Sequence, residues 1–154
     1  MYSTRISGHV DAAPAVVYRA LTDADAIAAW RVPVGMRGQV HEFEAREGGR
    51  FRVSLTYEVP GGTGKSTART DTYHGRFLRL VPDEQVVETM EFETSDPAMR
   101  GVMTMTTTLT ATAGGTEVTI LHEGIPDAVS PEDNETGTRM ALDNLARYVT
   151  GPTT

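Results

Sequence analysis

The chain has 154 residues, of which 39% are apolar, and its formal net charge is −7. A single domain of this length buries about 70% of the surface that its unfolded chain exposes, so one domain spanning residues 1–154 needs no disulfide or structural metal. The sequence contains no cysteine, which excludes disulfides, zinc–thiolate sites and thiol nucleophiles. The acidic charge also disfavours binding to nucleic acid and to anionic lipid surfaces.

The sequence shows no sign of export, membrane insertion or a bound metal. No apolar run approaches the roughly 18 residues of a membrane-spanning helix, and residues 1–5 lead into a polar, alternating segment rather than a signal-peptide core. The four histidines are scattered singly, without the spacing of metal ligands. We therefore expect a cytoplasmic protein with no membrane contact, no metal and no cofactor.

The first thirty residues predict a strand followed by two short helices. Apolar and polar residues alternate over 2–10, as in a half-buried strand. Pro14 suits the first turn of a helix that ends near Leu21. Thr22 and Asp25 have the spacing of a capping box for a second helix, which ends near Trp30.

The middle of the chain is dominated by period-two patterns that predict an antiparallel sheet. The clearest strands are expected at 50–57, 67–80, 85–93, 102–113 and 116–123. The segment 60–66 contains Gly-Lys-Ser but lacks the first glycine and the helix of a phosphate-binding loop, so we interpret it as a hairpin loop. Gly114 and Gly115 indicate a two-residue turn. In the acidic run over 83–96, Glu91 or Glu93 could face Arg76 and Arg79 on a solvated sheet face. An acidic edge that docks a partner is the less favoured alternative.

The last element is predicted to be a long helix. Ser130 suits an N-cap, Pro131 suits the first helical position, and the apolar stripe of the helix continues to about Val149. The predicted order is a strand, two small helices, six further strands and a long helix. Only one architecture of these elements buries both the apolar face of the sheet and the apolar stripe of the last helix. The expected fold is α+β, a curved antiparallel sheet wrapped around the final helix.

Short motifs along the chain occur in an order typical of one superfamily. They are Thr4-Arg5-Ile6 before Ala13–Tyr18, Trp30 followed by Pro33, Gly48–Phe51, Tyr73-His74-Gly75 ahead of Val81-Pro82, Gly115–Thr119, and Met140–Leu145. With these motifs the chain resembles the START-like, or SRPBCC, superfamily, and within it the branch named after activators of the heat-shock protein ninety ATPase. The resemblance implies a helix-grip fold, like that of the birch pollen allergen, with a cavity for lipophilic small molecules between the sheet and the last helix.

Two departures from the family pattern prevent a ligand from being copied across. Family members often carry a tryptophan near the start of the last helix, where this chain has Gly137-Thr138-Arg139. They often carry two adjacent aromatic residues where this chain has Trp30-Arg31. Either change could widen the cavity or alter its mouth, and a shared fold does not fix function.

Glu88 and His122 are the most informative polar residues, because each lies in the apolar phase of a predicted strand. A buried carboxylate or imidazole must be hydrogen-bonded, paired or neutral. The two side chains could therefore face a guest or each other, or else turn to solvent or satisfy buried backbone groups. The residues expected to line a ligand site are Trp30, Tyr57, Tyr73, Glu88, Met90, Phe92, Met105, His122 and Leu145.

Three functions remain open at this stage. The first is binding of a small lipophilic ligand, with Glu88 and His122 orienting its polar end. The second is an enzyme of the cyclase, dehydratase or hydrolase kind, in which Glu88 or His122 acts as general acid or base. The third is a protein-interaction module that stimulates a chaperone ATPase, which the family name suggests but no motif supports. The sequence leaves the ligand and the oligomeric state open, a homodimer included.

Overall fold

The computed structural model describes residues 1–32, 35–57, 70–94 and 96–151. The expected hairpin loop at 60–66 lies outside these residues. The strands are β1 (Tyr2–Val10), β2 (Met36–Phe43), β3 (Arg50–Tyr57), β4 (Thr70–Val81), β5 (Gln85–Phe92), β6 (Met103–Thr112) and β7 (Gly115–Ile125). The helices are α1 (Pro14–Leu21), α2 (Ala24–Trp30), the short 3₁₀ helix η1 (Pro97–Met99) and α3 (Pro131–Thr150).

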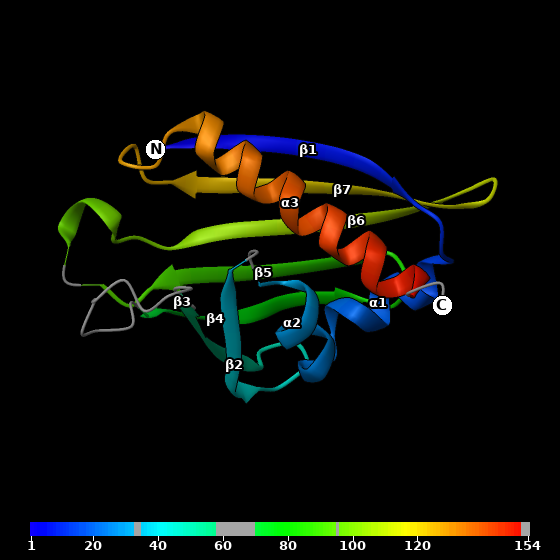
Figure 1. The fold of residues 1–154 in the computed structure, drawn as a ribbon, viewed down its shortest axis with the longest axis horizontal. Helices are drawn as coiled ribbons and strands as arrows, with labels where there is room; N and C mark the ends of the chain where they lie inside the picture. Colours follow the sequence, from blue (N-terminus) through cyan, green and yellow to red (C-terminus); the bar gives the residue numbers. More distant parts are fainter. Residues whose placement is uncertain (33–34, 58–69, 95, 152–154) are drawn as a thin grey trace.

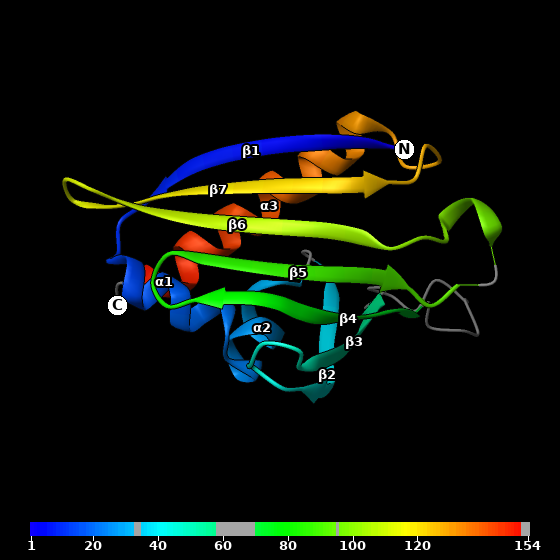
Figure 2. The ribbon, with the colours of Figure 1, turned by 180° about the vertical axis from the view of Figure 1, so that it is seen from behind.

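The seven strands form one antiparallel sheet in the order β1-β7-β6-β5-β4-β3-β2. Figure 1 shows α3 lying obliquely across this sheet, with α1 and α2 on the same side. Seen from behind, the strands lie in front of the three α-helices (Figure 2). The α+β helix-grip arrangement predicted from the motif order is therefore confirmed.

The beginning of α3 follows its predicted chemistry. The Ser130 hydroxyl accepts a hydrogen bond from the Asp133 amide at 3.1 Å, and Pro131 occupies the first turn. The inward stripe of the helix buries Thr138, Leu142 and Leu145. This stripe turns one face of α3 toward the concave side of the sheet.

The N-cap of α2 and the turn between β6 and β7 each lie one residue away from the predicted position. The N-cap of α2 is Asp23, whose carboxylate accepts from the Ala26 amide at 2.9 Å, whereas the Thr22 hydroxyl donates back to the Tyr18 carbonyl. A threonine at the end of one helix can satisfy a free carbonyl there, so the capping role passes to the next residue. In the β6–β7 hairpin Gly115 already pairs with Thr112, so the turn is formed by residues 113 and 114.

Aromatic side chains from neighbouring strands pack beside the cavity described below. Phe51 and Phe77 are almost fully buried, with ring centroids 5.3 Å apart, and Tyr73 contacts Phe51 edge to face at 6.3 Å. Phe92 contacts Tyr73 in the same way at 6.4 Å. These tilted contacts hold the Tyr73 ring in a fixed orientation beneath α3.

Candidate functional site: a cavity between the sheet and the last helix

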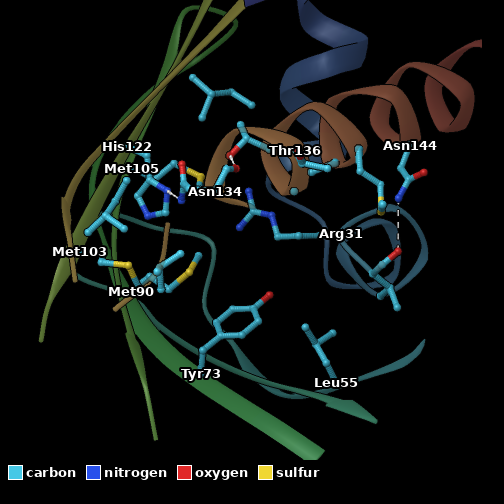
Figure 3. Close-up of a pocket in the computed structure, with 18 of the residues that line it drawn as sticks. Arg31, Leu55, Tyr73, Met90, Met103, Met105, His122, Asn134, Thr136 and Asn144 are labelled. Carbon is cyan, nitrogen blue, oxygen red and sulfur yellow. Dashed lines mark hydrogen bonds between the residues drawn. The ribbon is translucent and has the colours of Figure 1, made fainter. Parts of the chain in front are cut away.

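A cavity of about 520 Å³ lies between the concave face of the sheet and α3. The lining residues come from β3 to β7, from the ends of α1 and α2, and from α3 between Asp133 and Leu145. Most of these side chains are apolar. Figure 3 shows side chains from the strands and from α3 pointing into this space. Its lining includes seven residues expected from the sequence: Trp30, Tyr73, Met90, Phe92, Met105, His122 and Leu145.

Two expected residues do not line the cavity. Tyr57 is the last residue of β3 and is 43% exposed, because the inward phase of the strand continues past the region that other elements cover. Glu88 faces inward from β5 and is 1% exposed, but it lies beneath a neighbouring side chain instead of lining the cavity. The structure therefore differs from the expectation that these two side chains line the ligand site.

The side chain that covers Glu88 is Arg31. Its Nη1 and Nη2 atoms donate to the two Glu88 carboxylate oxygens at 2.8 and 3.3 Å. Burial is the largest single influence and opposes the charge on Arg31, but attraction to Glu88 and Tyr73 and the hydrogen bonds with them together hold the pKa of Arg31 above its ordinary value. The pair is a neutral, forked ion pair, and the guanidinium itself lines the cavity (Figure 3).

Arg31 is positioned by the end of α2. It is the C-cap residue of this helix, and its guanidinium carbon lies 5.0 Å from the ring centre of Trp30. The Trp30 indole is held in turn by a 2.8 Å hydrogen bond to the Ala20 carbonyl. The anchored indole supports the guanidinium from one side, and Glu88 fixes it through its hydrogen bonds.

Sequence reasoning missed Arg31 as a partner of Glu88. The two residues are 57 positions apart and belong to different elements, so no local spacing connects them. The available indication was chemical, because a carboxylate in the apolar phase of a strand requires a cation nearby. An arginine standing where relatives often carry an aromatic residue was the natural candidate.

His122 reaches the cavity from β7, and its hydrogen bonds indicate which ring nitrogen carries the proton. The Thr4 hydroxyl donates to Oδ1 of Asn134, so the Asn134 amide group faces the ring and donates to Nδ1 of His122 at 3.1 Å. With Nδ1 accepting, the neutral ring carries its proton on Nε2. That buried atom has no partner among the described residues.

The pKa of His122 is lowered mainly by burial, which attraction to Glu88 only partly offsets and which Arg31 reinforces. A lowered folded-state pKa means that the unfolded chain binds more protons below its own pKa of about 6.5. The contribution of His122 to stability is therefore complete above that pH and is lost as the pH falls below it. We expect His122→Gln to reduce the fall in unfolding free energy between about pH 7 and pH 5.

This expectation is checked by urea unfolding across that pH range, with His9→Gln as a control at an exposed position. An NMR titration of the His122 ring should also give a midpoint below 6.5. A midpoint above 6.5, or an identical pH profile in the two variants, would contradict a neutral buried imidazole.

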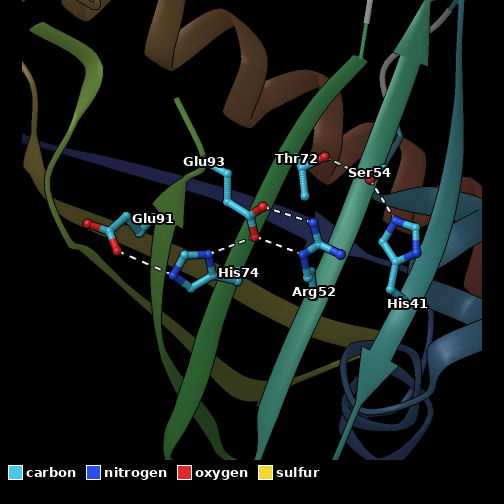
Figure 4. A network of polar contacts seen from close by, with 7 residues as sticks. All are labelled: His41, Arg52, Ser54, Thr72, His74, Glu91 and Glu93. Atoms are coloured by element: carbon cyan, nitrogen blue, oxygen red, sulfur yellow. Dashed lines mark hydrogen bonds and ion pairs between the residues drawn. The ribbon is translucent and has the colours of Figure 1, made fainter. Parts of the chain in front are cut away.

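A second polar network occupies the outer side of β3, β4 and β5 (Figure 4). Arg52 donates two hydrogen bonds to Glu93, each 2.9 Å long, and His74 contacts both Glu93 and Glu91. The Arg52 hydrogen bonds are the main reason that the pKa of Glu93 lies at about 2. Glu91 and Glu93 of the acidic run thus pair with Arg52 and His74, and not with the predicted arginines of β4, because these residues are neighbours across the strands.

This outer network is a poor candidate for a ligand site. Its charged groups already contact one another, and the Arg52 and Glu93 side chains are 46% and 32% exposed. Exposed pairs of this kind contribute at most about 1 kcal/mol to stability. The described residues contain no cluster of three or more His, Cys, Asp or Glu side chains arranged for a metal ion. None of the described helices could cross a membrane.

The fold and the cavity together define the class of protein. A curved antiparallel sheet that holds a long C-terminal helix over an apolar cavity is the helix-grip architecture of the START-like superfamily. The family model described as Activator of Hsp90 ATPase homolog 1-like protein matches residues 11–150. The chain belongs to this family, as the order of its motifs predicted.

Solved structures of similar proteins agree with this assignment. The crystal structure of protein CV1439 from Chromobacterium violaceum matches with 33% identity and a TM-score of 0.81, over 94% of each chain. A crystal structure from Rhodobacter sphaeroides matches with 24% identity and a TM-score of 0.77, over 94% of this chain and 90% of that one. The AHSA1-like protein from Aeromonas hydrophila matches with 19% identity and a TM-score of 0.73, over 96% and 92%. No curated protein matches the chain.

Proposed function

We propose that this protein binds a small lipophilic molecule in the cavity between the sheet and α3. The observation that carries the proposal is the cavity itself, whose volume of about 520 Å³ falls in the range of small-molecule sites. A hollow with apolar walls forgoes the packing that would fill a solid core, so a matching guest stabilises the folded state.

The methionines of the lining suit such a guest. Met90 and Met103 are opposite each other on β5 and β6, and Met105 follows on the same face of β6. Unbranched thioether side chains adapt to irregular apolar shapes. The lining can therefore adapt to a flexible or flat apolar ligand, and it does not require one particular ligand shape.

The geometry gives the enzyme hypothesis less support. Both Glu88 oxygens accept hydrogen bonds from Arg31, so the carboxylate is not free to move a proton for a guest. Among the two residues expected to act as general acid or base, His122 alone lines the cavity. The chaperone hypothesis rests on the family name alone, so binding remains our proposal.

Thermal denaturation with a panel of lipophilic compounds tests the proposal. A compound present at a hundred times its dissociation constant should stabilise the fold by about 2.7 kcal/mol, which raises the Tm by about 5–10 °C. Calorimetry should show one site per chain. The absence of any shift across aromatic, sterol-like and fatty-chain compounds would contradict the proposal.

Gly137 provides a matched pair of variants for this test. It lies on α3 in the cavity lining, and a Cβ atom built there meets nothing within 4 Å. Gly137→Trp places a large ring at this position of the lining and should reduce ligand affinity at least tenfold while the protein stays folded. Gly137→Ala should leave binding intact and raise the free energy of unfolding by about 0.5–1 kcal/mol, because glycine is a poor helix former. Equal ligand binding by both variants would place the guest elsewhere.

A further inference from the structure

The polar atoms that the fold leaves without partners lie in the cavity. In the described part of the chain, the buried side-chain nitrogen and oxygen atoms lacking a hydrogen-bond partner are the Tyr73 hydroxyl and Nε2 of His122. Tyr73 is 3% exposed and His122 is 7% exposed, and both residues line the cavity. Native proteins rarely leave buried polar groups unpaired, so two in one cavity point to a partner that occupies it.

Both of these atoms have a proton to donate. Nε2 of His122 carries the ring proton because Nδ1 accepts from Asn134. Burial lowers the pKa of His122, which keeps the ring neutral, and raises the pKa of Tyr73, which keeps the phenol protonated. The matching group on a guest is therefore a hydrogen-bond acceptor.

The guanidinium of Arg31 adds donors to the same space but no net charge. Glu88 takes two of its five N–H groups, and the Tyr73 hydroxyl lies close enough to the guanidinium to help raise the pKa of Arg31, which leaves the phenol's own O–H free to donate. Because Glu88 already balances its charge, an anionic guest would lose its hydration without gaining a free counter-ion. A cationic guest carries hydrogen-bond donors, so neither its own N–H groups nor the protein donors in the cavity would find an acceptor.

We propose that the guest is a neutral lipophilic carbonyl compound, such as a ketone, ester or quinone, whose oxygen accepts hydrogen bonds from Tyr73 and His122. This inference rests on the proposed binding function and adds the chemistry of the polar end. The apolar walls would enclose the body of the guest, and the donors would fix the position of its carbonyl oxygen.

Matched probes separate the carbonyl from the apolar body. 2-Acetylnaphthalene, 2-isopropenylnaphthalene and 2-naphthoate share one skeleton and differ in carrying a neutral acceptor, no acceptor or a charge, and the corresponding biphenyl compounds repeat the comparison on a longer body. We expect calorimetry to give a dissociation constant about tenfold lower for each ketone than for its hydrocarbon, with the carboxylates weaker than the ketones.

Tyr73→Phe tests the role of the hydroxyl while keeping the ring contacts with Phe51 and Phe92. We expect this variant to weaken ketone binding about fivefold, to leave hydrocarbon binding unchanged, and to have a ligand-free Tm no lower than that of the parent, because the lost hydroxyl had no partner.

Other results would contradict either the carbonyl inference or the binding function. Equal affinities for ketone and hydrocarbon, or a ketone preference that survives Tyr73→Phe undiminished, would overturn the carbonyl inference and leave the binding function standing. Tightest binding by the carboxylates would overturn it in favour of anion recognition. Failure of all six probes to bind would count against the binding function on which the inference rests.

Discussion

Glu88→Leu should lower the free energy of unfolding by about 3–5 kcal/mol, because it leaves the Arg31 guanidinium buried without its counter-charge. Glu88 is almost fully enclosed, and both of its oxygens accept hydrogen bonds from Arg31. Arg31→Met should be destabilising for the converse reason, since it leaves a carboxylate under the apolar wall of the cavity. Urea denaturation of each variant measures the effect.

The double variant Arg31→Met/Glu88→Leu distinguishes a coupled pair from two independent core residues. If the ion pair accounts for the loss, the double variant should recover most of the stability, so that its change is well below the sum of the two single changes. Additive losses would show that the two side chains contribute through packing alone. Comparison of the double variant with the parent also measures the net effect on stability of a charged pair, relative to an apolar pair, beside the cavity.

The sequence placed two polar residues in the apolar phase of strands, but it showed neither whether they are buried nor how their hydrogen bonds are satisfied. The two-residue period of the strands put Glu88 and His122 beside apolar neighbours and left open whether they turn to solvent, whereas the structure buries both. Arg31 lies 57 positions from Glu88, and Asn134 lies 12 positions from His122 on the helix that follows its strand, so the path of the chain through space brings each pair together. Strand periodicity contains no information about such contacts.

Tyr57 shows that the alternation of strand residues does not by itself predict burial. Its phase on β3 is that of the buried Phe51 and Val53, yet its side chain is 43% exposed at the end of the strand. Alternation predicts the side of a sheet on which a residue lies, whereas coverage by a helix or by other strands decides whether that side is buried. The fold was predictable because motif order and element order agreed along the chain.

Within one of those motifs, Tyr73-His74-Gly75, the glycine itself has a structural role. Gly75 lies on β4 opposite Phe51 and Met90. A Cβ atom built at this position would lie 1.8 Å from the Thr89 carbonyl oxygen and 2.7 Å from Cζ of Phe51. The first of these neighbours is backbone in the adjacent strand, so the conflict cannot be relieved by turning a side chain.

Gly75→Ala should therefore cost about 3 kcal/mol or more, although the same change adds only a methyl group at Gly137 and is expected to stabilise there. Chemical denaturation of the two variants side by side separates the local environment from the general effect of replacing glycine. A loss below about 1 kcal/mol at Gly75 would show that β4 and β5 can move apart at little cost. Because β5 also carries Glu88 and Met90, such freedom would mean that the cavity wall is not held rigidly by the sheet.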